Sequence, residues 1–226
     1  MSPGELLSLY GVGIGPKTGI SATVQNGAIG TTLGGVQVFF DEIAAPLLYA
    51  ASDQIQVQAP FEIAGRQNVQ VAVHYAGSQS NSLNIVVFQE VPGIFTTDGN
   101  PYGPSAVLNQ DGSLNTPDNP AARGSIVSIY LTGGGVTEPP GVTGEVTPVA
   151  PLRSLSAPIR GYIGPKEASV TFAGAAPGLI SGANVINLQI PDDAQTGDRI
   201  PVSIVFLIHP GGPSGVQPIA PNIAIR

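Results

Sequence analysis

The chain has 226 residues, of which 42% are hydrophobic and 10% are charged, and its formal net charge is -7. This hydrophobic content excludes a disordered chain, and the acidic balance, with only eight Lys and Arg, argues against a nucleic-acid partner. The 30 Gly and 22 Pro residues separate short apolar runs, which is typical of an all-β protein with many turns.

No apolar run approaches the ~20 residues that a membrane-spanning helix needs, so we expect no membrane insertion. The absence of Cys fits an exported protein and a cytosolic protein equally. Sparse Lys and abundant small polar residues favour export. We therefore expect a secreted or cell-surface location.

The first part of the chain predicts seven short strands and no long helix. Seven strands with turn signals between them indicate a sandwich of two antiparallel sheets. The predicted strands are residues 5–10, 20–25, 36–40, 43–49, 54–59, 68–75 and 82–88.

The predicted strand at residues 54–59 alternates most clearly. Ile55, Val57 and Ala59 share one face, which we expect to lie in the core. The other face carries three glutamines, which we expect to be in contact with water: Gln54, Gln56 and Gln58.

A connector of about residues 96–123 follows. It contains a predicted hairpin that turns at Asp111 and Gly112. Just before it, Ile94 and Phe95 are two large apolar residues that an exposed tether has no reason to carry. We expect both to be buried against the second half of the chain and to help hold the two halves in one orientation.

Residues 124–135 repeat residues 4–15 almost position by position, which predicts one unit written twice. We place the first sandwich at residues 1–95, and the connector and the second sandwich at residues 96–226. Residues 162–172 correspond to residues 39–49. Tyr49 and Phe172 are therefore expected to be equivalent core aromatics.

The second copy has two insertions rich in Pro and Gly, at residues 137–150 and 209–217. Such composition predicts surface loops, and loops are where binding residues often lie. These two loops are the candidate sites for recognition of a glycan or a protein.

With these motifs in view, the chain resembles the C-terminal domain family of large secreted proteins in Solibacter and other Acidobacteria. Each half also resembles the immunoglobulin-like domains called IPT or TIG. The first resemblance covers nearly the whole chain and rests on residues 4–16, 32–60, 92–96, 106–115, 119–120 and 124–125. The resemblance implies an extracellular module with no catalytic residue to transfer. The chain departs from the family at the glycines 133–135 and at residues 208–213.

Chemistry-bearing residues are sparse. His74 and His209 lie at the ends of predicted strands without a suitably spaced partner, so we predict no enzyme and no cofactor. Alternating oxygen-bearing side chains around Gly112 form a weak calcium candidate, although the loop lacks the distal Glu of a calcium-binding loop. The candidate ligands are Asn109, Asp111, Ser113, Asn115 and Asp118. An ordinary hairpin is the simpler interpretation.

The leading hypothesis is therefore a non-enzymatic extracellular spacer, anchoring or adhesive module whose partners are other domains of a parent protein or cell-envelope components. The first alternative is a binding module that uses the loops at 137–150 and 209–217. The second alternative is a self-assembling subunit, because a free sheet edge at the start of the chain would accept a strand from a neighbour.

Overall fold

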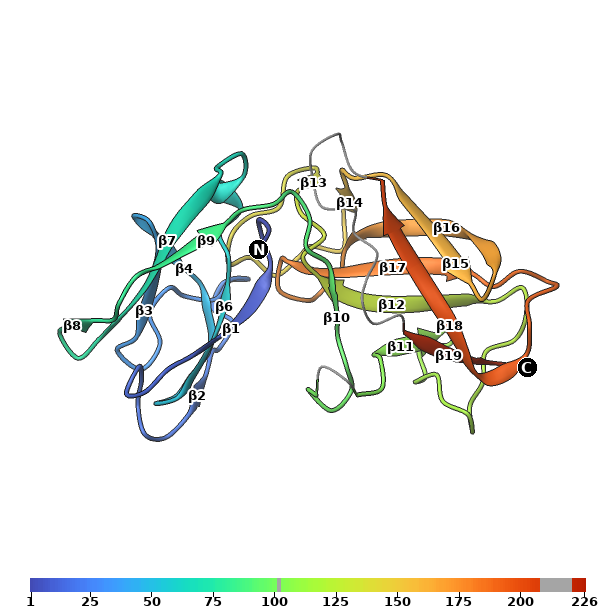
Figure 1. The fold of residues 1–226 in the computed structure, drawn as a ribbon, viewed down its shortest axis with the longest axis horizontal. Helices are drawn as coiled ribbons and strands as arrows, with labels where there is room; N and C mark the ends of the chain where they lie inside the picture. Colours follow the sequence, from blue (N-terminus) through green and yellow to red (C-terminus); the bar gives the residue numbers. More distant parts are fainter. Residues whose placement is uncertain (101–102, 208–220) are drawn as a thin grey trace.

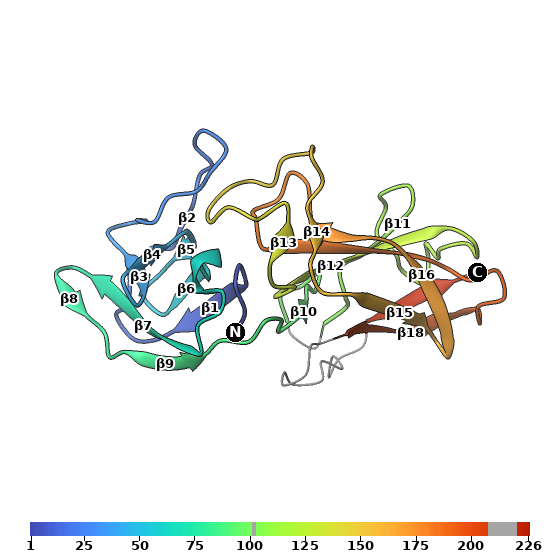
Figure 2. The same cartoon turned by 90° about the horizontal axis from the view of Figure 1, so that it is seen from above.

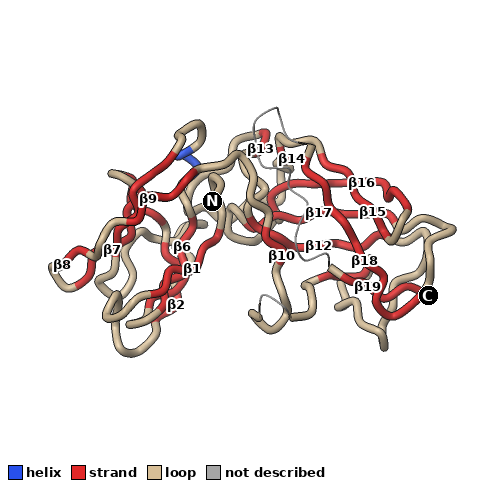
Figure 3. Tube along the Cα trace, viewed as in Figure 1, coloured by secondary structure: helices blue, strands red, loops and turns tan. Residues whose placement is uncertain are grey.

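A computed structural model describes residues 1–100, 103–207 and 221–226. The regular structure of these residues is almost entirely β-strand, with one short 3-10 helix, η1 (Phe61–Ile63), and no α-helix (Figure 3). The strands form antiparallel sheets in two lobes that lie side by side (Figure 1). The prediction of an all-β fold is confirmed.

No helix among the described residues has the length and apolarity that crossing a membrane requires.

The first lobe, which we call the first unit, holds strands β1 to β9 in two sheets with an apolar core between them. One sheet has the order β1-β6-β5-β2, and its strands are β1 (Leu6–Tyr10), β2 (Ile20–Ser21), β5 (Leu47–Ala50) and β6 (Gln54–Gln58). The other has the order β4-β3-β7-β8, and β9 also pairs with β7; its strands are β3 (Gln37–Phe40), β4 (Ile43–Ala45), β7 (Asn68–Tyr75), β8 (Ser78–Gln79) and β9 (Leu83–Val86). Phe40, Leu47, Ile55 and Val57 are among the fully buried core residues.

The second lobe, the second unit, holds strands β10 to β19 around its own core. Its main strand order is β10-β12-β17-β16-β15-β18-β19, and β11 also pairs with β12 while β14 pairs with β13 and β16. The strands are β10 (Gly93–Ile94), β11 (Val107–Asn109), β12 (Ile126–Thr132), β13 (Thr137–Glu138), β14 (Ser154–Leu155), β15 (Ile159–Ile163), β16 (Lys166–Ala175), β17 (Ala183–Gln189), β18 (Gly197–Phe206) and β19 (Asn222–Ile225).

Pro46 explains why the first unit has two separate sheets. In the second unit the long strand β16 pairs with β15 through its first residues and with β17 through its last, so it joins both layers. In the first unit the corresponding stretch is divided at Pro46 into β4, which pairs with β3, and β5, which pairs with β6. Proline has no backbone N–H to donate, so it interrupts the ladder at this point.

The start of the second unit differs from the predicted domain boundary. The sequence predicts that the first domain extends to residue 95, but β10 pairs with β12, at Leu131 and Thr132. The backbone of residues 93–94 thus extends the second unit's sheet. The backbone N–H and C=O groups along one edge of β12 need partners, and the connector pairs with them directly after the first unit ends.

The burial predicted for Tyr49 and Phe172 is wrong, because both rings are half-buried at the outer faces of their sheets. A β-bulge precedes each residue, so that Tyr49 lies opposite Gln56 and Phe172 lies opposite Asn187. Side chains directly opposite each other on paired strands point to the same face of the sheet. An extra residue in one strand reverses the face to which the side chains after it point. The bulges therefore turn both aromatic side chains out of the cores.

Removing the Tyr49 ring should lower the free energy of unfolding by less than shortening the side chain of a core residue does. Ile55→Ala is expected to lower the free energy of unfolding by about 2–5 kcal/mol, because it leaves a cavity among buried side chains. Tyr49→Ala is expected to lower it by less than about 2 kcal/mol. Urea denaturation of the two variants measures this, and an equal loss in both would show that Tyr49 belongs to the core.

Candidate functional site

The two units meet in a contact region that we call the junction. From the first unit it contains residues 2–6, 25–29 and 58–62, and from the second it contains residues 132, 141–147 and 180–182. Figure 2 shows the segment between β2 and β3 beside the segment between β13 and β14.

Gln58, the last residue of β6, lies at the centre of the junction and is 0% exposed. Its Nε2 donates to the carbonyl oxygen of Ser181, and its Oε1 accepts from the backbone N–H of Gly144 at 2.7 Å. A buried amide must have its hydrogen-bonding groups satisfied, and here both ends bind backbone groups of the other unit. The side chain therefore links the two units directionally.

The prediction that Gln58 contacts water is wrong, whereas Gln56 is exposed and Gln54 is half-buried. The alternation in β6 assigned the outer face of the sheet correctly. However, the second unit covers this face at the end of the strand. A glutamine there looks the same in the sequence whether water or another unit provides its partners.

A backbone ladder also crosses the junction. Ile29 N–H donates to the carbonyl oxygen of Gly144 at 2.8 Å, and Val146 N–H donates to that of Gly27 at 2.7 Å. On its other side the same segment accepts a bond from Ser181 N–H to the carbonyl oxygen of Glu145, at 2.7 Å. Residues 144–146 thus lie between the two units as a short strand that is bonded on both edges.

Thr143 adds a side-chain link to the short helix η1. Its hydroxyl oxygen accepts from the backbone N–H of Phe61 at 2.9 Å, and its hydroxyl donates to Glu62 Oε2 at 2.7 Å. The Phe61 ring lies against Gly4 and Gly141, where a Cβ on either glycine would overlap the ring. This ring therefore packs between glycines of both units.

Thr132 and Gly182 bring a second-unit turn close to β1. Leu6 N–H donates to Thr132 Oγ1 at 2.8 Å, and that hydroxyl donates to the carbonyl oxygen of Gly182 at 2.9 Å. Gly182 has a φ of 105°, and a Cβ there would overlap the carbonyl oxygen of Gly4. Only glycine permits this approach without strain.

An apolar cluster completes the junction. Leu6 of β1 packs with Phe95, Tyr130 and Phe172 against small buried residues of the second unit, Ala176, Ala183 and Val185. Phe95 N–H also donates to the carbonyl oxygen of Tyr130 at 3.0 Å. Phe95 and Ile94 are both half-buried, and Ile94 packs against the second unit's main core.

The three glycines at 133–135 allow the connector to cross the second unit. Val91 N–H donates to the carbonyl oxygen of Gly133 at 2.9 Å. A Cβ at Gly133 would overlap the carbonyl oxygen of Val91, and one at Gly135 would overlap that of Gln89. These glycines therefore let the connector pass close to the backbone that follows β12.

Two charged groups lie at the edge of the junction. Burial raises the pKa of the Glu5 carboxyl above its usual value, although hydrogen bonds from Ser2 and the nearby N-terminal charge oppose this effect. Glu145 forms an ion pair with the buried Arg153, with Nη1 and Oε2 2.7 Å apart. This pair fixes the loop that carries residues 143–147.

The loop at 137–150, one of the two candidate recognition loops, thus contributes its central residues to the junction. Gly144 and Thr147 are buried, and Val149 and Ala150 are exposed. The other candidate loop, 209–217, lies outside the described residues, as does His209.

The calcium candidate residues form a network that is bonded within the protein. Asn109 Oδ1 accepts from Asn115 Nδ2 at 2.8 Å, and Asn115 Oδ1 accepts from Ala224 N–H at 2.7 Å. Asp111 Oδ1 accepts from the hydroxyl and the N–H of Ser113, and these bonds lower the pKa of the Asp111 carboxyl.

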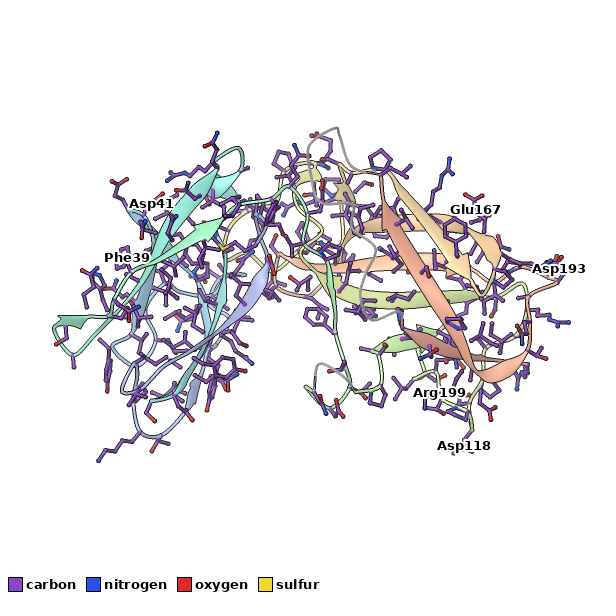
Figure 4. The ribbon with its side chains drawn as sticks, in the orientation of Figure 1. Phe39, Asp41, Asp118, Glu167, Asp193 and Arg199 are labelled. Atoms are coloured by element: carbon purple, nitrogen blue, oxygen red, sulfur yellow. The ribbon has the colours of Figure 1, made fainter. Side chains whose placement is uncertain are left out.

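Asp118 is exposed at the outer edge of the second unit (Figure 4). The Oδ1 atoms of Asn109, Asp111 and Asn115 thus accept from protein donors, and Asn115 Nδ2 also donates to the carbonyl oxygen of Ala224 at 3.0 Å. The arrangement ties the connector to β19. Within the described ranges no group of three or more His, Cys, Asp or Glu is placed to hold a metal ion.

His74 lies on β7 with its ring 4.8 Å from that of Phe39 on β3, in a tilted arrangement. Figure 4 labels Phe39 on the first unit, away from the junction. This contact accounts for the position of His74 by packing between neighbouring strands.

Comparisons with models of known protein families and with curated proteins found no match to this chain.

Replacing Gln58 should weaken the junction far more than replacing its neighbour. Gln58→Leu leaves the carbonyl of Ser181 and the N–H of Gly144 without partners, and each buried unpaired group costs about 1–3 kcal/mol. We expect a loss of at least about 2 kcal/mol in the free energy of unfolding.

The matched control is Gln56→Leu, which changes an exposed side chain and should stay within about 0.5 kcal/mol of the unmodified protein. Chemical denaturation compares the two variants. Equal stabilities of the two would contradict the role assigned to Gln58.

Proposed function

We propose that this chain is a non-enzymatic structural module: a tandem pair of immunoglobulin-like sandwiches that acts as a spacer or anchoring element of a larger exported protein. The observation that carries the proposal is the junction. Two units that only followed each other along a chain would need neither a buried Gln58 nor a backbone ladder between them. A spacer that holds its ends in a set geometry needs both.

The strand pairing supports the tandem repeat. In the first unit β6 lies between β1 and β5, with Ile55 opposite Leu9 and Val57 opposite Leu7. In the second unit β17 lies between β12 and β16, with Ile186 opposite Ile129 and Leu188 opposite Val127. The bulge before the half-buried aromatic residue recurs in both units. On this interpretation, the two units share one arrangement of strands that occurs twice in the chain.

An extracellular location follows from the proposed resemblance to the acidobacterial C-terminal domains and to IPT or TIG domains. The composition supports it, because the chain has only eight Lys and Arg and many small polar residues. On this proposal the partners are neighbouring domains of the parent protein or components of the cell envelope, and the module's role is to set their distance and direction.

Small-angle scattering tests the fixed geometry. In Gly182→Ala the new Cβ overlaps the carbonyl oxygen of Gly4, so we expect the units to separate and the distribution of interatomic distances to broaden. The unmodified protein should give one narrow distribution.

Gly178→Ala is the matched control. Gly178 also has a positive φ, 79°, but its Cβ would meet no atom within 4 Å. Gly178→Ala therefore introduces the same kind of backbone strain without touching the other unit, and the scattering of this variant should match that of the unmodified protein. A broad distribution in the unmodified protein would contradict the proposal.

A further inference from the structure

The outer edge of β1 differs from the corresponding edge in the second unit. β1 is the last strand of its sheet and pairs with β6 alone among the described strands. β12, which holds the same position in the second unit, pairs with β17 on one side and with β10 and β11 on the other. Among the described strands, β10 and β11 cover this edge in the second unit, whereas no strand covers it in the first unit, where Thr132 accepts the N–H of Leu6.

The backbone direction in β1 shows which groups face the uncovered edge. Ala59 N–H donates to the carbonyl oxygen of Glu5, and Gly11 N–H donates to that of Asp53. Because bonding groups alternate along a strand, the backbone groups of Ser8 and Tyr10 point away from β6. The equivalent residue in β12, Tyr130, has both groups bonded to the connector, through Phe95 N–H and the carbonyl oxygen of Ala106.

The side chains differ in the same way. In the second unit Val127 and Ile129 are fully buried on a strand that pairs with β11, whose Val107 lies opposite Ile129 and is itself 1% exposed. In the first unit the corresponding Leu7 and Leu9 are only half-buried. The core of the first unit is thus incomplete at the place that a side chain like Val107 would cover.

Two large apolar residues near this edge are exposed to water. Tyr10 is 76% exposed and Val12 is 99% exposed, whereas Thr132, which corresponds to Val12, is buried. A groove of about 480 Å³ runs beside the edge, lined by Leu7 and Ser8 on one side and by residues 93–96 on the other. The surface thus combines backbone groups that no described residue pairs with, apolar side chains and space.

We infer that the edge of β1 is a binding site for an extended strand of another polypeptide, which pairs antiparallel with residues 7–9. The occupant has the chemistry of β11: a branched aliphatic side chain at the position of Val107 to cover Leu7 and Leu9, and backbone groups that pair with Ser8 and Tyr10. Main-chain bonds supply the affinity and the aliphatic side chain supplies the selectivity.

The test uses a peptide with the sequence of residues 104–110, labelled with a fluorophore at its N-terminus, as the probe. Fluorescence anisotropy with the full chain should show saturable binding. Amide NMR signals of Ser8 and Tyr10 should shift, whereas those of Ser128 and Tyr130 should not, because β11 already occupies that edge.

Two variants of the chain and one variant of the peptide distinguish strand pairing from non-specific apolar binding. Ser8→Pro removes an N–H that points to the groove and leaves the bonds to β6 in place, so the affinity should fall at least about tenfold. Ser8→Thr retains that N–H and should bind within about twofold of the unmodified chain. A peptide with proline in place of Leu108 should not bind, and this arm does not depend on the folding of any variant.

The inference is overturned if the peptide fails to bind at about 1 mM, or if Ser8→Pro and the proline peptide leave the binding unchanged. It is also overturned if the NMR shifts map to Ser128 and Tyr130. None of these outcomes bears on the junction, so the proposed spacer function is tested separately.

Discussion

The arrangement of the two units depends on the burial of the Gln58 side-chain amide, which cannot remain unpaired away from water. Its two partners are backbone groups at Ser181 and Gly144, on two different segments of the second unit. Both bonds persist only in one relative placement of the units. The packing of Leu6 against the cluster of Ala176, Ala183 and Val185 adds apolar contact area but tolerates sliding. The hydrogen bonds of Gln58 therefore fix the relative orientation of the units.

Close backbone approach makes these bonds possible, and glycine makes the approach possible. Gly182 allows a turn of the second unit to touch Gly4, and Gly133 lets the connector cross β12. Farther from the junction, the Asn115 side chain binds both backbone groups of Ala224 and ties the connector to the last strand. The connector is therefore part of the second unit's sheet, and the junction acts on a single folded body.

The strand pattern could be predicted from the sequence because each strand alternates locally. The face of the sheet to which each side chain points could also be predicted, except after a bulge. The bulges before Tyr49 and Phe172 cannot be recognised from the alternation of apolar and polar residues. The burial of Gln58 could not be predicted, because its partners lie in two distant segments of the second unit. The candidate ligands around Asp111 show a similar limit: oxygen-bearing residues at suitable spacing do not reveal which protein donors already bind them.

The most direct test of the fixed junction is a distance between the units measured by pulsed electron paramagnetic resonance. The chain has no Cys, so spin labels at Gln79→Cys and Glu167→Cys, both exposed, would report on one unit each. The labels should give one narrow distance peak, as narrow as that of a pair within the first unit, Gln79→Cys and Asp53→Cys. A broad or multiple distribution for the pair across the junction, with a narrow one within the unit, would contradict the account.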